Sequence, residues 1–494
     1  MRKLLPFGVI LLLFLLHFPF LTADPEPKAD VNTRGAWTDE GLYTSQIRNY
    51  LISGEFAMKE NSTFVRGPLF NLIQLPFFLV FGSSQLVSRL IVLLSVLLVL
   101  FLFLKEKKLE ATGIFFTILL LIQYHIFHFS HYGLAEMLCN SMVLASLWFL
   151  IQYHNRPNRK TLYLLISSAL LFATYSCKIQ FLYVAAILPV AMFFIGVAAF
   201  RNKKKTFKDS FSGFFLSTAF SFGFSLLYLI WYFRNMEFYN YIMSNEVNGR
   251  FPANIHDILA VFRFNVAEFM WIGPLKYLWI ALFVSLCGLV FLIFKRKINS
   301  SYKIVMLFSL IWIVLELHKI PMTYLPNRYL LSLYVAAGLF ISATFSVLFS
   351  SGKSMKIAIS ILSVLVLIFN LSGIIQSFRS RTYDIRTVNH YLKCCSYKPG
   401  IALGSWATAV SWETDLKTMP VWNNYFNSKD PINTLNPELI IVEENEAETD
   451  RAFISNGISL SQQSDSSRVF RIWRYPVRVY WIKQHKFMHT LSAF

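Results

Sequence analysis

The sequence predicts an all-α polytopic membrane protein with about 11 transmembrane helices, followed by a small C-terminal α/β domain. The first observation is composition: 55% of the 494 residues are hydrophobic, 15% are charged, and the mean hydropathy is +0.50. A soluble domain cannot bury so much apolar surface, so lipid must cover part of it. The second is that apolar runs such as 85–104 and 356–376 are long enough to cross the hydrocarbon as helices. The third is a polar tail that begins near residue 377.

Apolar runs between polar breaks define the expected helices. No alternating pattern typical of a membrane β-barrel competes with them. We therefore assign residues 1–376 to a transmembrane domain and residues 377–494 to a C-terminal domain. The expected spans lie near residues 4–22, 85–104, 110–128, 134–152, 161–177, 179–199, 211–232, 273–294, 303–317, 329–350 and 356–376.

Lysine and arginine are concentrated in alternate connections between these spans. By the positive-inside rule, such loops face the cytoplasm, which places the first outer loop (23–84) and the C-terminal domain on the opposite side. The net charge of +19 is then explained by loops beside anionic headgroups and requires no nucleic acid. The basic stretches are residues 105–108, 156–160, 201–208, 295–303 and 352–356.

The N-terminal segment, residues 1–23, is compatible with two interpretations. Its basic start, apolar stretch and small-residue end are typical of a cleaved signal peptide. The same stretch could be a retained first helix, which we expect because the predicted architecture uses it.

The C-terminal domain is expected to mix strands and helices. Residues 400–406 and 437–446 are short β-like runs bounded by Gly, Pro and Asn, and residues 384–395 and 447–456 are helix-like. Residues 471–487 mix aromatic and basic side chains, so we expect this end to lie against the headgroup interface.

An acidic pair, Asp39 and Glu40, stands in the first outer loop just ahead of a helical pattern. Thr38 or Asp39 could simply cap that helix. Alternatively, a carboxylate at the outer surface could remove the proton from an acceptor hydroxyl. Arg66 then precedes an apolar segment, residues 69–82, which is too short to span and is expected to lie in the interface. A cation in that position is suited to a lipid phosphate.

The order of these motifs resembles the dolichyl-phosphate-mannose protein mannosyltransferases and aminoarabinose transferases. These are GT-C glycosyltransferases, of the family 39 type, which use polyprenyl-phosphate sugars. Members usually have Lys-Pro-Pro where this chain has Arg66, Gly67 and Pro68, so the cation is kept and the backbone around it differs. The resemblance covers about residues 1–376. It rests on the acidic pair, the turn at 53–56, Arg66 and Pro68, the Phe81-Gly82 end of the apolar stretch, and Arg89.

Four further positions match the family. Glu136 stands where members commonly have Asp; it is a functional candidate, although its carboxylate could also reach to the interface. Lys178 follows a helix where members often have Lys-Gly, and either anchors the interface or contacts the donor phosphate. Arg328 and Tyr329 resemble the Arg-Tyr pair of a late outer loop, which implies phosphate contact; an aromatic belt is the alternative.

The resemblance implies a membrane glycosyltransferase that moves a sugar from a polyprenyl-phosphate carrier, with inversion, at the outer face. The implied partners are that donor, a glycolipid, polysaccharide or protein acceptor, and a bilayer, which we expect to be the bacterial inner membrane. Asp39 is the expected general base or acceptor-holding group. Glu40 and Glu136 would shape an acidic pocket. The leaving phosphate would be met by Arg66, Lys178, Arg328 and Tyr329.

Two other functional classes compete with this hypothesis. A transporter or flippase for lipid-linked sugars would share the hydrophobicity and the cations. Transporters, however, place ionisable residues near the bilayer midplane and show repeated halves, whereas the key charges here fall at outer helix ends. A non-catalytic assembly or receptor protein is the third class, in which Asp39 would be replaceable.

No metal site is expected at His125, His128 and His131, although they recur every three residues. On a helix, His125 and His131 point in different directions, and no Cys or Asp joins them. The cofactor is left open, because a divalent cation could bind beside Asp39 and Glu136.

Overall fold

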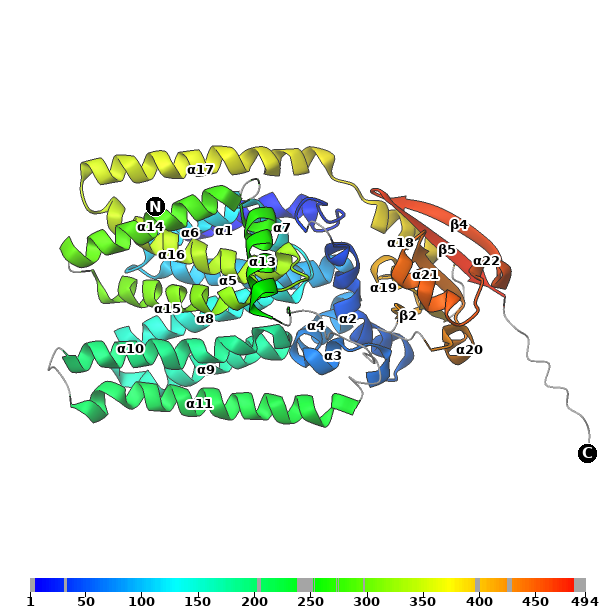
Figure 1. Ribbon diagram of the computed structural model, residues 1–494, viewed down its shortest axis with the longest axis horizontal. Coiled ribbons are helices and arrows are strands. Elements are labelled where there is room, and N and C mark those ends of the chain that lie inside the picture. Colours follow the sequence, from blue (N-terminus) through cyan, green and yellow to red (C-terminus); the bar gives the residue numbers. More distant parts are fainter. Residues whose placement is uncertain are drawn as a thin grey trace, which may run out of the picture.

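The computed structural model describes residues 5–30, 33–201, 206–237, 252, 254–271, 273, 275–295, 298–395, 400–423 and 429–483. Long helices form a bundle, and a smaller domain with a sheet covers one end of it (Figure 1).

Nine helical segments among the described residues are long and apolar enough to cross a membrane. Each coincides with one of the spans expected from the sequence, so the chain is a multi-pass integral membrane protein with the predicted helical fold. The segments are α5 (Gln85–Lys105), α8 (Ala135–Asn155), α9 (Lys160–Cys177), η4 (Ile179–Ala186) with α10 (Ile187–Arg201), α11 (Phe207–Arg234), α14 (Leu275–Lys295), α15 (Ser300–Glu316) with η6 (Leu317–Lys319), η7 (Asn327–Leu330) with α16 (Leu331–Phe349), and α17 (Lys353–Ser380).

The other two expected spans are shorter helices. The first is α1 (Leu5–His17) with η1 (Phe18–Phe20). The second was expected as one helix over 110–128 but is divided into α6 (Glu110–Ile122) and α7 (Tyr124–Phe129). The break is at Gln123, whose backbone is extended and whose side chain accepts a hydrogen bond from the Ile126 amide at 2.6 Å. The extended backbone ends α6, and this cap starts α7 as a separate helix.

Helix α16 is the centre of the bundle. It is buried along its whole length, against α15, α14 and α6. Because other helices pack around α16, these neighbouring helices and not α16 face lipid.

The first outer loop folds between the bundle and the C-terminal domain (Figure 1). Within it, α4 contains 14 residues and Pro76, in agreement with the expectation that this segment is too short to span. Two further elements, α13 (Ile255–Asn265) and the π-helical turn η5 (Val266–Met270), precede α14. The elements of the outer loop are α2 (Gly35–Ser53), η2 (Met58–Glu60), α3 (Thr63–Arg66) and α4 (Pro68–Phe81).

The C-terminal domain contains a mixed sheet of five strands among its described residues, in the order β2-β1-β3-β5-β4. Strand β1 pairs in parallel with β2 and β3, whereas β5 is antiparallel to both β3 and β4. The strands are β1 (Ile401–Leu403), β2 (Lys417–Met419), β3 (Leu439–Glu443), β4 (Ser464–Ile472) and β5 (Tyr475–Ile482). The helices are α18 (Asp384–Cys395), α19 (Ala407–Val410), α20 (Pro431–Leu435), α21 (Ala447–Ile454) and α22 (Leu460–Gln463).

One expectation for this domain was wrong. Residues 471–482 do not lie along the headgroups as a surface segment, because they form the end of β4 and all of β5. Strand β5 is hydrogen-bonded on both edges, and Val477 and Val479 are buried in the core. Period-two burial overrides the composition of aromatic and basic residues that suggested an interface. Residues 484–487 lie outside the described residues.

Helix α2 is bonded tightly to the C-terminal domain. Arg48 is buried and donates to the backbone oxygens of Trp412, Thr414 and Leu416 at 3.0, 2.6 and 2.8 Å. The domain therefore holds the helix that carries the acidic pair.

Candidate functional site

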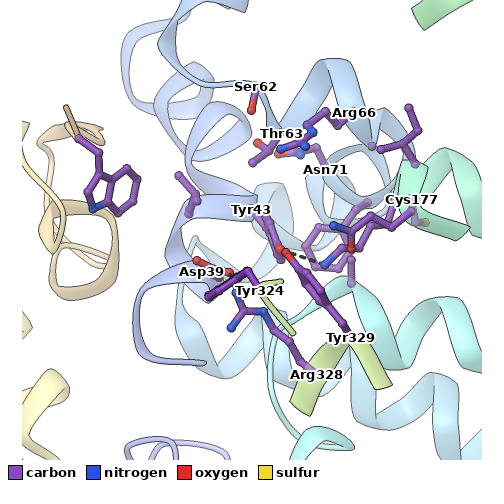
Figure 2. Close-up of a pocket in the computed structure, with 18 of the residues that line it drawn as sticks. Asp39, Tyr43, Ser62, Thr63, Arg66, Asn71, Cys177, Tyr324, Arg328 and Tyr329 are labelled. Carbon is purple, nitrogen blue, oxygen red and sulfur yellow. Dashed lines mark hydrogen bonds and ion pairs between the residues drawn. The ribbon is translucent and has the colours of Figure 1, made fainter. Parts of the chain in front are cut away.

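A cavity of about 460 Å³ opens at the end of the bundle that carries the C-terminal domain. It lies between α2, the α3–α4 segment, the α9–η4 junction and η7, with the C-terminal domain as its cover (Figure 2). A space of this size can hold a sugar and a phosphate. The side chains that line it come from Asp39, Leu42, Tyr43, Ser62, Thr63, Arg66, Gly67, Phe70, Asn71, Ala135, Cys177, Lys178, Ile179, Gln180, Tyr324, Arg328, Tyr329, Trp422, Asn423 and Arg451.

Helix α2 supplies Asp39 and Tyr43 to the same wall of the cavity. The two residues are one turn apart, so their side chains lie on one face of the helix. Glu40, the next residue after Asp39, points elsewhere. The helical spacing therefore separates the two members of the acidic pair.

Arg328, at the start of η7, is the centre of a buried charge cluster. Its Nη2 atom lies 3.0 Å from Asp39 Oδ2, and its Nη1 atom lies 2.6 Å from Asp30 Oδ2. Its Nε atom lies 3.9 Å from Glu136 Oε1. Gly35 makes room for the guanidinium, because a Cβ atom there would lie 1.7 Å from Arg328 Nη1.

Lys178 is the second cation of the cluster, at the junction of α9 and η4. Its Nζ atom lies 2.5 Å from Glu136 Oε1 and donates to the Tyr43 hydroxyl at 3.0 Å. The ammonium also lies over the rings of Tyr43 and Tyr329, at 4.9 and 5.4 Å from their centroids. Such contacts with carboxylate and ring faces fix the ammonium at the cavity wall.

The α3–α4 segment forms the opposite wall and supplies Arg66. Figure 2 shows Arg66 on the same side as Ser62, Thr63 and Asn71, across Tyr43 from Asp39. Gly67 allows this segment to approach the α9–η4 junction, since a Cβ atom at Gly67 would lie 2.1 Å from a backbone oxygen there.

Burial changes the proton affinity of the acidic groups of the outer loop. Burial raises the pKa of the Asp39 carboxyl above its ordinary value, while Arg328 and Lys178 act in the opposite direction. Burial likewise raises the pKa of Asp30 to about 6, against the effect of Arg328. Burial, followed by the charges of Asp39 and Glu136, holds the pKa of Tyr43 well above its ordinary value, so its hydroxyl remains protonated.

The structure brings most of the sequence-predicted site residues together. Glu136 is buried at the edge of the cavity, where it contacts two of the cations, and no described residue forms a hydrogen bond with its Oε2 atom. The residues that line the cavity are Asp39, Arg66, Lys178, Arg328 and Tyr329.

Glu40 lies outside the cavity lining. Both of its carboxylate oxygens accept hydrogen bonds from Arg89, at 2.9 and 2.7 Å, and they also accept from Gln85 and the Gly133 amide. Arg89 is fully buried and donates as well to the backbone oxygens of Phe20 and Ala23. Glu40 therefore ties α2 to α5, and the structure places it away from the acidic pocket that it was expected to shape.

Sequence reasoning missed three residues that the structure places at the site. Asp30 lies in an irregular segment with no pattern to mark it. Tyr43 could have been found from its helical spacing to Asp39. Asn71 could have been found as a polar side chain within an apolar stretch.

The carboxylates of the cluster do not fit a divalent cation as they are arranged. Asp39 Oδ2 and Glu136 Oε1 face Arg328 and Lys178, which already neutralise them. Within the described part of the chain, no three His, Cys, Asp or Glu side chains are arranged to hold a metal ion. His131 instead packs beside His17, with their Nδ1 atoms 2.9 Å apart.

Comparison with solved structures identifies the fold of this chain. No protein-family model and no curated protein sequence matches the chain. Among solved structures it is similar to ArnT from Cupriavidus metallidurans bound to undecaprenyl phosphate, with a TM-score of 0.53, 12% identity and 97% of each chain covered. It is also similar to the Archaeoglobus fulgidus oligosaccharyltransferase tethered with an acceptor peptide, with a TM-score of 0.52, 13% identity, and 89% of this chain and 69% of that chain covered. The chain thus has the fold of the GT-C glycosyltransferases, with their helical membrane bundle and, as in ArnT, a C-terminal mixed sheet.

Proposed function

We propose that this protein is a glycosyltransferase that moves a sugar from a polyprenyl-phosphate carrier to an acceptor hydroxyl at the outer face of the membrane. The observation that carries the proposal is one cavity in which a buried carboxylate, Asp39, lies among the cations Arg66, Lys178 and Arg328. The shared fold supports it, since ArnT was solved with undecaprenyl phosphate and the oligosaccharyltransferase with an acceptor peptide.

In the proposed reaction, the acceptor oxygen attacks the anomeric carbon as the bond between that carbon and the phosphate oxygen breaks. The configuration inverts, and polyprenyl phosphate leaves. Asp39 takes the acceptor proton. Its Oδ2 atom is held by Arg328, and its Oδ1 atom accepts a long hydrogen bond, 3.5 Å, from Thr38. The raised pKa of the carboxyl makes it a stronger base than an exposed aspartate.

The cations are assigned to the phosphate. Negative charge on the leaving phosphate grows as the glycosidic bond breaks, and positive charges held at the cavity wall stabilise that growth. Lys178 and Arg328 are held by Glu136 and Asp39, and Arg66 faces them from the other wall. Tyr329 lies beneath both Lys178 and Arg328 and steadies them. Glu136 positions Lys178 and Arg328, whereas Glu40 ties α2 to α5 through Arg89; neither is given a part in bond making.

The position of the cluster also distinguishes this proposal from a transporter. The charged residues of the cavity lie at helix ends and in the outer loop, not at the bilayer midplane where transporters bind their cargo. We further propose that the acceptor is a glycolipid, polysaccharide or protein and that the protein lies in the bacterial inner membrane.

The test is transfer of radiolabelled sugar from polyprenyl-phosphate donors in membranes that contain the wild type, Asp39→Asn or Glu55→Gln at equal expression. Glu55 is an exposed acid in the same outer loop and serves as the matched control. Loss of a general base is expected to lower the rate by about 10²-fold or more in Asp39→Asn, with no change in Glu55→Gln. Equal transfer by all three proteins would refute the role of Asp39. Movement of the lipid-linked sugar across vesicles without transfer would favour a flippase.

A further inference from the structure

One polar side chain in the cavity has no hydrogen-bond partner among the residues that the structure describes. Asn71 on α4 is 1% exposed, and neither its amide nitrogen nor its amide oxygen makes a hydrogen bond within the described ranges. A buried amide without partners costs free energy, so such groups normally meet a water or a ligand. Asn71 lines the cavity while its amide atoms are enclosed, so a rotation of the side chain when a ligand enters would let the cavity's occupant supply the missing partners.

The chemistry of this wall differs from that of the cation cluster. An uncharged amide offers both donors and an acceptor. A hydroxyl group can satisfy both, whereas a phosphate, whose oxygens only accept, can satisfy the donors and leaves the amide oxygen without a partner. Ser62 and Thr63 add hydroxyl groups to the same wall, as Figure 2 shows. Phe70, one residue before Asn71, adds an aromatic face that can lie against the C–H groups of a sugar ring.

We infer that Asn71 binds a hydroxyl group of the transferred sugar, so that the sugar of the donor lies against α4 while its phosphate lies at Lys178 and Arg328. The inference rests on the proposed function and assigns the sugar subsite within it. It makes Asn71 a specificity-determining residue that selects donors with a hydroxyl group at the matching ring position. A site built to bond a hydroxyl group discriminates strongly against a sugar that lacks it.

The helix provides a matched control. Gln74 lies one turn after Asn71 on α4 and is equally buried at 1% exposure. Its amide also has no hydrogen-bond partner in the described part of the chain. It does not line the cavity. Leucine is close in size to both amides, so Asn71→Leu and Gln74→Leu impose similar changes on packing and differ in access to the ligand.

The experiment measures the affinity of the purified full-length protein in detergent for two probes. One is undecaprenyl phosphate, and the other is the undecaprenyl-phosphate hexose or pentose that the wild type binds best in a panel. In Asn71→Leu, the affinity for undecaprenyl phosphate should stay within about twofold, while the sugar-bearing probe loses about tenfold or more. Gln74→Leu should leave both affinities unchanged, and Asn71→Ser should recover part of the loss.

Several outcomes would overturn the inference. Equal weakening of both probes by Asn71→Leu would indicate a packing role, and no change in either would indicate that water satisfies the amide. If the wild type binds and transfers sugar and Asn71→Leu keeps the wild-type preference for the sugar-bearing probe, the subsite is refuted and the proposed function is not. A wild type that binds neither probe would remove both.

Discussion

Arg48 offers the sharpest test of how the C-terminal domain is held. Its guanidinium donates to the backbone oxygens of Trp412, Thr414 and Leu416 and to the Thr414 hydroxyl, and the side chain is buried. Asn49, the next residue, adds two bonds to the backbone of Thr418. We expect Arg48→Met to release residues 411–419 from α2.

The magnitude follows from the three carbonyls. Methionine fills much of the volume of Arg48 but has no donor, so three buried backbone oxygens lose their partner at once. Water that enters the vacated space limits the loss to about 1 kcal/mol for each oxygen, or about 3 kcal/mol in total. A change of 1.4 kcal/mol is a factor of ten, so protection of this segment against local opening should fall about 10²-fold.

Hydrogen exchange measures that opening directly. Amides in residues 411–419 of Arg48→Met should exchange about 10²-fold faster than in the wild type. Arg386→Met, at an exposed position of α18, is the control and should leave the rate unchanged. A change of less than about threefold in this segment, or an equal increase throughout the chain, would refute the reasoning.

Two predictions concern the site itself. Gly67→Ala brings a Cβ atom to 2.1 Å from the backbone oxygen of Cys177, so we expect it to lower the melting temperature and the transfer rate, with a cost of about 1–3 kcal/mol. Gly8→Ala, in helix α1 with nothing within 4 Å, should leave the melting temperature unchanged or raise it slightly. Either variant departing from this order in thermal melting would contradict the close contact. Burial raises the pKa of Asp30 to about 6 from an ordinary 3.8, so the folded state binds the carboxyl proton more tightly than the unfolded state does. The stability that this proton contributes is therefore full below pH 4 and is lost as the pH rises to 6. Melting temperatures of the wild type should therefore fall over that window relative to Asp30→Asn, by the equivalent of about 3 kcal/mol, and parallel curves would exclude this assignment.

The membrane spans could be predicted because lipid imposes a length and a composition on each helix independently of the others. Within a single span, however, hydropathy does not detect a break in the helix. The break at Gln123 depends on one side-chain cap inside a continuous apolar run, so α6 and α7 were expected as one helix. For strand β5 the signal was present but was not used. The sequence has an alternating pattern that includes Val477 and Val479, but the aromatic and basic composition of the segment suggested an interface instead.

The site was only partly predictable, because its charges come from distant parts of the chain. Asp30 and Arg328 are 298 positions apart and yet form a hydrogen bond of 2.6 Å. A motif can indicate that Asp39 and Arg328 matter, but no periodicity shows that they contact each other. Local periodicity does decide which acid of the pair faces the cavity. Asp39 shares a helix face with Tyr43, while Glu40 is turned toward Arg89.

The ion pairs at the cavity bear on how a donor phosphate would bind there. Each carboxylate near the cavity faces a cation, so a phosphate that enters must compete with Asp39 and Glu136 for Arg328 and Lys178. Breaking such a pair without a replacement leaves a buried charge uncompensated, whereas exchanging one anion for another does not. Entry of the donor phosphate at Arg328 would loosen its hold on Asp39 Oδ2 and free that carboxylate to act as a base. Arg328 would then have two roles, because it would bind the donor phosphate and, before the donor arrives, keep Asp39 in an ion pair.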